Sequence, residues 1–115
     1  MIKETFGERV RRKRMEKQIS LRKFANMIAV SPTYLFQIEW DDCKPPVEQK
    51  IREIAKILGE NEDEMLALAN KISSDLKIII WKYPKEIAAF LRTAKEFGWK
   101  DWEDLTEEIA KKLSQ

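Results

Sequence analysis

The sequence contains no histidine and only one cysteine, Cys43, among its 115 residues. A single cysteine cannot form a disulfide within the chain, and the usual zinc sites need several cysteine and histidine ligands. A nucleophilic cysteine normally depends on a histidine base, which is missing here. No phosphate-binding loop is visible either. We therefore expect no catalytic residues, no metal and no cofactor, and a protein that is not an enzyme.

Long apolar runs are also missing. No stretch of about eighteen consecutive apolar residues occurs, so the sequence predicts no membrane-spanning helix. The first ten residues, MIKETFGERV, lack the apolar core of a secretory signal. These two absences predict a cytoplasmic protein. Four tryptophans and five phenylalanines nevertheless provide enough apolar bulk for the core of one domain, or of a head with a helical extension.

The net charge of +2 hides an uneven distribution of charge along the chain. Residues 1–58 hold 13 Lys or Arg against 8 Asp or Glu, which gives +5. Residues 59–115 hold 9 against 12, which gives −3. A basic first part beside an acidic second part is typical of a DNA-binding head with a tail that does not bind DNA. Chance variation among solvated faces would also produce this difference, so the charge alone does not decide the function.

Residues 20–39, SLRKFANMIAVSPTYLFQIE, have the pattern of two short helices joined by a turn. Ser20 and Ser31 can each cap a helix, because a serine oxygen accepts hydrogen bonds from the free N–H groups at a helix start. Pro32 is tolerated at the first helical position, where its missing N–H has no partner in any case. Apolar residues recur on the inward side of both segments at Phe24, Ala25, Ile28, Leu35 and Ile38.

This pattern resembles the helix-turn-helix of the lambda-repressor-like family, also called the XRE or Cro/C1 type. Leu21, Ala25, Ala29, Leu35 and Ile38 occupy its five signature positions, and the two small alanines would let the helices approach closely. The preceding segment FGERVRRKRMEKQIS resembles the family's first helix and turn. The later segment IREIAKILGENEDEML resembles its fourth helix and the start of its fifth. The resemblance covers roughly the first two-thirds of the chain.

Each remaining helix has a recognisable start or stop signal. In chain order these signals are a capping box of Thr5 and Glu8, the sequence KPP at 44–46, Gly59, Asn61, Ser73 with Ser74, Pro84, and Asp101 as a cap for the last helix. The β-favouring run IIIW at 78–81 has helical flanks. We therefore expect an all-α chain with a lambda-repressor-like five-helix head at 1–70 and an extension of about three helices at 71–115.

The resemblance implies a sequence-specific DNA-binding regulator, most simply a repressor that binds a palindromic operator in double-stranded DNA as a dimer. In the family the second helix of the motif, here 31–39, enters the major groove. The positions expected to read bases are Pro32, Thr33, Tyr34 and Gln37. A glutamine can bind N6 and N7 of adenine, and a threonine can contact a thymine methyl. Phe36 also points outward, where it could contact DNA or pack on a neighbouring helix.

Contacts to the DNA backbone are expected from several basic residues. Lys44 follows the recognition helix at a position where family members often place a phosphate-binding lysine or arginine. Arg22 and Lys23 lie in the first turn of the preceding helix, close to where that helix would cross the backbone. The basic cluster at 11–13 provides weaker candidates.

Two further features concern the support of the recognition helix. In many family members the positions of Arg14 and Glu39 form an ion pair that joins the first helix to the recognition helix, and the same pair is expected here. Many members have a glycine where this chain has Asp41, although aspartate tolerates a left-handed turn better than most residues. Asp41 and Asp42 also place negative charge near the expected path of the phosphates.

The extension carries too many large aromatic residues for a solvated spacer, and such residues are favoured at interface cores. Because these repressors typically read two-fold symmetric sites, we expect a homodimer formed by the last two helices. The surface expected to form it consists of Ile87, Phe90, Leu91, Trp102, Leu105 and Ile109. Two alternatives stay open: closure of these faces on the chain's own head, and binding of another protein such as an antirepressor, a protease or a toxin. In the last case the chain would be an antitoxin or a similar interaction module.

Overall fold

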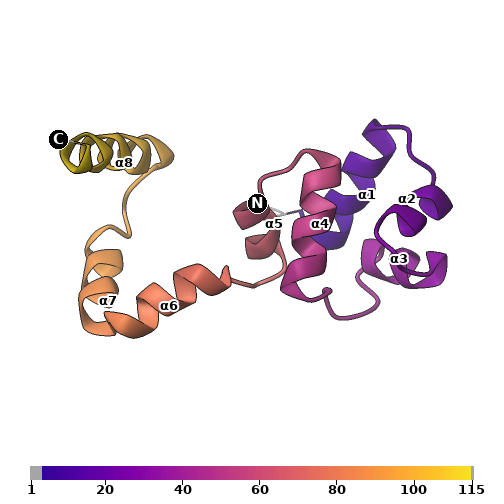
Figure 1. Cartoon of the computed structure of the whole chain (residues 1–115), viewed down its shortest axis with the longest axis horizontal. Helices are drawn as coiled ribbons and strands as arrows, with labels where there is room; N and C mark the ends of the chain where they lie inside the picture. The colour runs from indigo at the N-terminus through magenta and orange to yellow at the C-terminus, as the bar shows by residue number, and fades with distance from the viewer. Residues whose placement is uncertain (1–3, 115) are drawn as a thin grey trace. The chain divides into compact units, whose positions relative to one another are not determined.

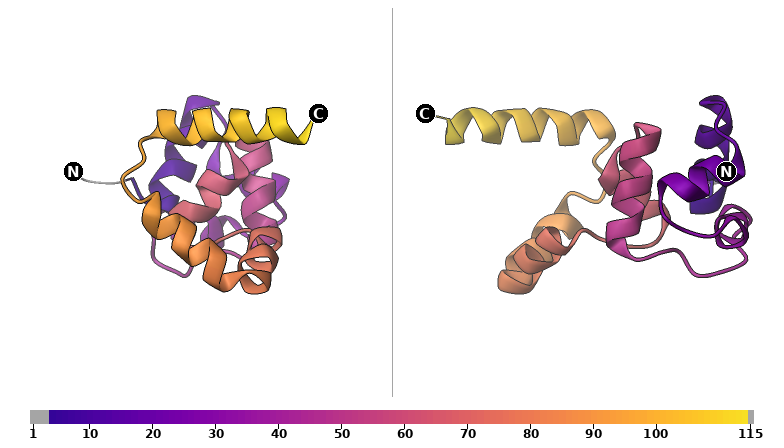
Figure 2. Two further views of the ribbon diagram at one scale, coloured as in Figure 1. Left: turned by 90° about the vertical axis from the view of Figure 1, so that its left-hand side faces the viewer. Right: turned by 45° about the vertical axis from the view of Figure 1, so that its right-hand side comes forward.

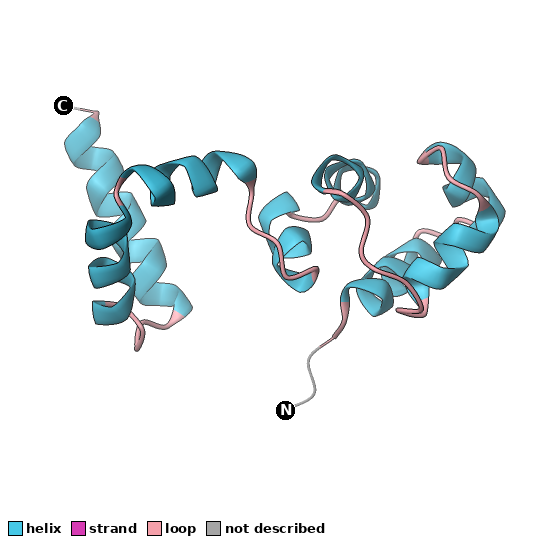
Figure 3. Ribbon diagram, turned by 90° about the horizontal axis from the view of Figure 1, so that it is seen from below, coloured by secondary structure: helices cyan, strands magenta, loops and turns pink. Residues whose placement is uncertain are grey.

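A computed structural model describes residues 4–114 and contains eight α-helices, with no strand among those residues (Figures 1 and 3). The helices are α1 (Phe6–Glu16), α2 (Leu21–Met27), α3 (Pro32–Glu39), α4 (Glu48–Leu58), α5 (Glu62–Leu68), α6 (Ser74–Lys82), α7 (Pro84–Thr93) and α8 (Trp99–Leu113). The all-α fold expected from the sequence is confirmed. The run IIIW lies within α6 and is helical. The chain divides into two compact units, Met1–Leu76 and Lys77–Gln115.

The helices of the first unit begin and end at the predicted signals. Ser20, Ser31 and Asn61 each accept a hydrogen bond from the backbone N–H three residues later, at 3.1, 3.1 and 2.9 Å. Thr5 and Glu8 form the predicted capping box at the start of α1. Gly59 ends α4 in a left-handed conformation with a φ of 70°, which glycine adopts without steric cost. Local sequence therefore fixes most helix boundaries of this unit.

The first five helices enclose one hydrophobic core. Its members come from each of the five helices and from the connections after α2 and α5: Phe6, Val10, Phe24, Ala25, Ile28, Leu35, Ile38, Ile51, Ile54, Ala55, Leu58, Met65, Leu66 and Ala69. Apolar burial of this kind contributes most of the driving force for folding. The core holds α2 and α3 against α1 and α4, and so fixes the angle at which α3 is presented.

The turn between α2 and α3 corrects one expectation. Ala29 is exposed and has a φ of 57°, so it is the left-handed residue of the turn rather than a small residue at a helix contact. A non-glycine residue in this region costs conformational energy. The turn is held by a hydrogen bond from the Val30 N–H to the Ala25 carbonyl at 2.9 Å. In addition, Lys50 of α4 donates to the Ile28 carbonyl at 2.5 Å.

The start of α1 lies very close to the end of α3. A Cβ atom built on Gly7 would be 2.3 Å from the Ile38 carbonyl oxygen and 2.8 Å from that of Glu39. Real Cβ atoms do not approach backbone oxygens so closely, and backbone cannot move aside as a flexible side chain can. The absence of a side chain at position 7 therefore allows the close approach of α1 to the end of α3.

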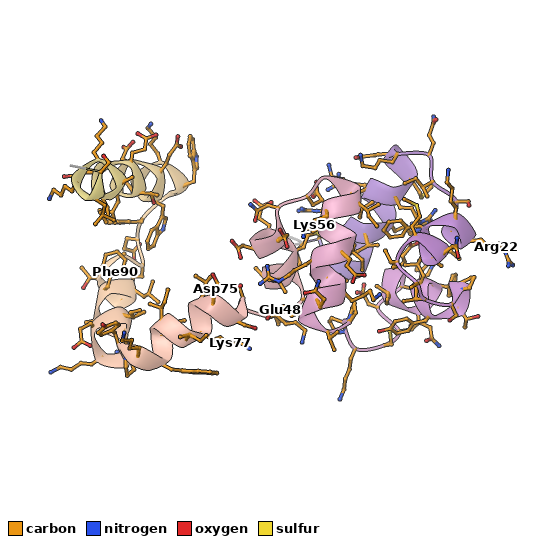
Figure 4. All side chains as sticks on the ribbon, in the orientation of Figure 1. Arg22, Glu48, Lys56, Asp75, Lys77 and Phe90 are labelled. Carbon is orange, nitrogen blue, oxygen red and sulfur yellow. The ribbon has the colours of Figure 1, made fainter. Side chains whose placement is uncertain are left out.

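A polar cluster joins the end of the first unit to α4. Arg52 donates to Glu48 at 2.8 Å and to the hydroxyl of buried Ser73 at 2.6 Å, while Ser74 donates through its hydroxyl to Glu48 at 2.7 Å. Figure 4 labels Glu48 at the start of α4. The hydrogen bonds from Arg52 and Ser74 lower the pKa of Glu48 to about 2. The first turn of α6 is therefore fastened to the head.

The second unit buries little of its own surface. In residues 77–114 only Ala94, at the end of α7, is buried. Trp102 of α8 makes edge-to-face contacts with Phe90 and Phe97, at centroid distances of 5.9 and 5.3 Å. The helix α8 is the longest of the described helices and runs without interruption (Figure 2). Within this unit large apolar side chains stay exposed at Ile78, Ile79, Trp81, Tyr83, Phe90, Leu91, Phe97, Trp99, Trp102, Ile109 and Leu113.

The start of α8 differs from the expectation that Asp101 caps it. The capping position belongs to Gly98, and Asp101 lies three residues inside the helix start. Its carboxylate accepts a hydrogen bond from the Gly98 N–H at 2.9 Å. The acidic residue still stabilises the helix start, through the free N–H groups there, but from the first turn rather than from the cap.

The close approach at Gly7 yields a first prediction. Gly7→Ala should lower the free energy of unfolding by about 1–3 kcal/mol, because the added methyl group must displace the backbone of α3. Thermal or urea denaturation followed by circular dichroism measures this change. Gly98→Ala is the matched control, since its Cβ would meet no atom closer than 3.9 Å. Equal small effects at the two positions would contradict the proposed backbone contact.

Candidate nucleic-acid interface

The helix α3 has one buried side and one exposed side. Leu35 and Ile38 point into the core, so Thr33 and Gln37 stand on the opposite side and are exposed. Pro32, at the first position of α3, is partly exposed. These three predicted base-reading residues therefore share an accessible face with outward-pointing hydrogen-bonding and apolar groups.

Tyr34 behaves differently from the other three residues predicted to read bases. It is half-buried and packs against the hydrophobic core. Much of its ring is therefore used for packing. Thr33 and Gln37 are therefore more accessible on α3 than this tyrosine.

The basic residues predicted to contact phosphates are exposed, and the described part of the chain gives them no acidic partner. Among residues 4–114, no carboxylate oxygen lies within 4.0 Å of the charged nitrogens of Arg22, Lys23 or Lys44. Arg22 projects outward from α2 (Figure 4). Together with Pro32, Arg22 and Lys23 line a hollow between the starts of α2 and α3. A cation without a carboxylate partner can bind an anion without first breaking an ion pair.

The basic cluster on α1 is mostly neutralised within the head. Arg12 pairs with Glu4 at 2.6 Å and with Glu16 at 3.1 Å, and Lys13 lies 3.4 Å from Glu16 and 3.6 Å from Glu60. The hydrogen bond from Arg12 is the largest cause that lowers the pKa of Glu4 to about 2. The pairs with Glu16 follow from its spacing along the helix, three and four residues after Lys13 and Arg12. The pair of Lys13 with Glu60 could not be read from the sequence, because Glu60 reaches α1 only through the tertiary fold.

Arg14 and Glu39 form the expected ion pair between α1 and α3. Two guanidinium nitrogens of Arg14 donate to the two carboxylate oxygens of Glu39, at 2.6 and 3.0 Å. The third nitrogen donates to the Ile19 carbonyl at 2.8 Å. The side chains are 11% and 2% exposed, so the charges are largely removed from water. A bidentate pair in such a position fixes orientation because each group satisfies the other's hydrogen-bonding capacity.

Asp41 turns toward the start of α1. It has a φ of 55°, the left-handed conformation that many family members take with glycine. Its carboxylate accepts from the Thr5 hydroxyl at 2.6 Å and from the Gly7 N–H at 3.2 Å. A negative charge at a helix start is favourable because the N–H groups there carry partial positive charge. This second cap of α1 could not be predicted from the sequence, since Asp41 lies 36 and 34 positions from its partners Thr5 and Gly7.

The single cysteine shows no sign of a nucleophile. Cys43 is partly buried, and burial together with the nearby Asp42 and Asp41 raises the pKa of its thiol. A thiol with a raised pKa is a poor nucleophile and a poor metal ligand at neutral pH. No grouping of three or more His, Cys, Asp or Glu suited to a metal occurs within residues 4–114. Within the described part of the chain, every helix is too short or too polar to span a bilayer.

This chain resembles known proteins in structure rather than in sequence. No protein-family model and no curated protein matches the sequence. The SinR/SinI protein complex is matched over 96% of this chain and 100% of the other, with 19% identity and a TM-score of 0.52. The clp gene regulator ClgR from Corynebacterium glutamicum is matched over 79% of this chain and 90% of its own, with 23% identity and a TM-score of 0.50.

A third match is SinR, a master regulator for biofilm formation, in complex with DNA. It covers 54% of this chain and 98% of that one, with 27% identity and a TM-score of 0.49. ClgR and the SinR/SinI complex are 23% and 19% identical to this chain, and structural similarity at that level of identity establishes the fold alone. The chain has the lambda-repressor-like helix-turn-helix fold. The resemblance found in the sequence is confirmed at this level.

The ion pair between α1 and α3 yields a second prediction. Arg14→Ala and Glu39→Ala should each destabilise the head by about 3–5 kcal/mol, because either change leaves an unpaired charge in a buried position. The double variant should lose much less than the sum of the two. A double-mutant cycle from urea denaturation measures the coupling. Additive losses would mean that the two side chains do not interact in solution.

Proposed function

We propose that this chain is a sequence-specific DNA-binding transcriptional regulator, acting most simply as a repressor. The observation that carries the proposal is the exposed side of α3, where Thr33 and Gln37 stand on a helix held rigidly by Arg14 and Glu39. In this fold the second helix of the motif lies in the major groove and its first residues touch base edges. The gene-regulatory role of ClgR, which shares the fold, supports the same assignment.

The two kinds of contact would have separate roles. Gln37 is suited to bind N6 and N7 of adenine, and Thr33 to contact a thymine methyl, with Pro32 and Tyr34 beside them. Arg22, Lys23 and Lys44 would bind phosphates, which fix position without reading sequence. The unpaired state of these three cations supports the assignment. Asp41 is hydrogen-bonded to the start of α1, so its carboxylate would not compete with DNA phosphates for these cations.

The second unit is proposed to form a homodimer through α7 and α8. A unit of this size that buries one residue cannot supply a core of its own, so its exposed apolar residues need a partner surface. Two heads on half-sites about 34 Å apart, one turn of DNA, would double the contacts to a palindromic operator. The surface assigned to the partner copy consists of Ile87, Phe90, Leu91, Trp102, Leu105 and Ile109.

A second candidate function follows from the same exposed surface. The chain could be an interaction module, such as an antitoxin, whose second unit binds another protein while DNA binding is secondary. The structure that matches over 96% of the chain is itself a complex of two proteins, SinR and SinI. A foreign partner would then cover the apolar side chains in place of a second copy. The oligomeric state of the purified chain distinguishes these candidates.

A third prediction tests base reading. The operator is first obtained by sequencing DNA fragments that the protein selects from a random pool. Gln37→Ala should then relax preference at one base pair in each half-site, at a cost of about 1–3 kcal/mol for the preferred base. Lys44→Ala should weaken binding to all duplexes alike and reduce the salt dependence. If Gln37→Ala discriminates among all single-base operator variants as the parent does, α3 does not read bases through this residue.

A fourth prediction tests the homodimer by analytical ultracentrifugation of the whole chain. The protein should sediment as a dimer, and Leu91→Lys or Ile109→Lys should shift it toward monomer by placing a charge in the interface. Ile78→Lys, an exposed apolar residue outside the proposed surface, is the control and should remain dimeric. A parent protein that stays monomeric at high micromolar concentration, both free and on a palindromic site, would rule out the dimer and favour closure on the head or a foreign partner.

A further inference from the structure

Arg11 differs from the neighbouring basic residues of α1 in the kind of side chain that it contacts. Arg9, Arg12, Lys13 and Arg14 each lie in an ion pair with a glutamate. Among residues 4–114, no carboxylate oxygen lies within 4.0 Å of the guanidinium nitrogens of Arg11. The sequence presents five adjacent or near-adjacent cations that look equivalent. The fold neutralises four of them, and within the described residues it gives Arg11 no acidic partner.

Arg11 is instead held by an aromatic side chain at the end of the recognition helix. Its guanidinium carbon lies 4.7 Å from the centroid of the Trp40 ring. Trp40, which follows α3, in turn contacts Phe36 at a centroid distance of 6.1 Å. A guanidinium over an indole face is attracted by the ring's quadrupole and keeps its N–H edges free for other acceptors. Arg11 is thus positioned without its charge being neutralised.

The two aromatic rings are unusually exposed for their size. Phe36 is 50% exposed and Trp40 is 51% exposed. Phe36 lies three residues after Thr33, and Trp40 lies three residues after Gln37, so each ring is next to one of these two residues on the helix surface. Trp40 lies one helical turn beyond Phe36. We call Phe36, Trp40 and Arg11 the aromatic ledge. It is continuous with the face of α3 that is proposed to read bases.

The carboxylates near the ledge have other partners. The hollow beside Trp40 is also lined by five acidic residues, Glu4, Glu8, Glu16, Glu39 and Asp41. Glu4, Glu16 and Glu39 are in the ion pairs given above. Glu8 accepts from the Thr5 N–H at 3.1 Å, and Asp41 is bonded to Thr5 and Gly7. Arg11 is therefore the cation that this region leaves available to a ligand.

We propose that Arg11, held in place by Trp40, binds a phosphate of the DNA backbone beside the bases that α3 reads. This inference rests on the proposed function. Trp40 acts as a positioning residue, since it limits the freedom that a long arginine side chain would otherwise lose on binding. The occupant is a phosphodiester because the ledge offers a cation and N–H donors in continuity with the base-reading face.

The test measures how DNA affinity depends on salt. For each phosphate neutralised on duplex DNA, the slope of log K against log salt changes by about 0.9. Arg11→Ala should therefore flatten the slope by about 0.9 for each head bound, on the selected operator and on random duplex alike. Arg12→Ala is the matched control, being the next residue and exposed but ion-paired, and it should leave the slope unchanged. Trp40→Ala should weaken binding, whereas Trp40→Phe should restore part of it by keeping a ring under Arg11.

A scan of the operator with neutral methylphosphonate linkages locates the contact. One linkage in each half-site should weaken the parent protein and have no further effect on Arg11→Ala. Circular dichroism of each variant establishes that the head is folded. If Arg11→Ala keeps the parent's salt slope and its full set of sensitive linkages while Gln37→Ala still relaxes specificity, the ledge does not bind phosphate but the proposed function stands. A parent protein that selects no sequence and binds no duplex would instead overturn the proposed function itself.

Discussion

The buried ion pair of Arg14 and Glu39 is the constraint on which the orientation of α3 depends. It joins α1 to the last turn of α3, and through the Ile19 carbonyl it also reaches the start of α2. Hydrophobic packing would tolerate small rotations of α3, because apolar contacts have no direction. A bidentate pair does not, since its hydrogen bonds weaken quickly with angle. Gly7 adds a second constraint by bringing the backbones of α1 and α3 into contact. Orientation and distance are thus fixed by different means.

The same fold sorts the basic residues of the head into two groups. Cations on α1 that form ion pairs with Glu4, Glu16 or Glu60 support the structure, and these pairs neutralise most of their charge within the head. The cations at the start of α2, in the connection between α3 and α4, and at the aromatic ledge keep their charge among the described residues. The net charge of +5 over residues 1–58 therefore does not show where the cations outside ion pairs lie on the surface. Non-specific attraction to DNA depends on total charge, but register along the duplex depends on where unpaired cations stand.

Much of the head could be predicted from the sequence, because its signals are local. Serine and asparagine caps, the glycine that ends α4 and the apolar spacing of each helix act within a few residues. What could not be predicted depends on contacts across the fold. Asp41 caps α1 from 36 residues away, and Arg11 rests on Trp40, 29 positions along the chain. The left-handed Ala29 was also missed, since alanine carries no signal for that conformation. One contact between distant parts of the chain was predicted, the ion pair of Arg14 and Glu39, and that prediction came from the family resemblance.

The second unit poses a different energetic problem from the head. Its helices have well-marked starts, yet only Ala94 is buried among residues 77–114, and edge-to-face contacts of Trp102 leave both partner rings partly exposed. Helices of this length gain most of their stability from packing of an amphipathic face rather than from intrinsic propensity. Association through these faces would therefore stabilise the unit and pair two heads in one step. If the proposed homodimer forms, DNA with two correctly spaced half-sites would favour the associated state over the separate chains, and operator binding would then be thermodynamically coupled to association of the second unit.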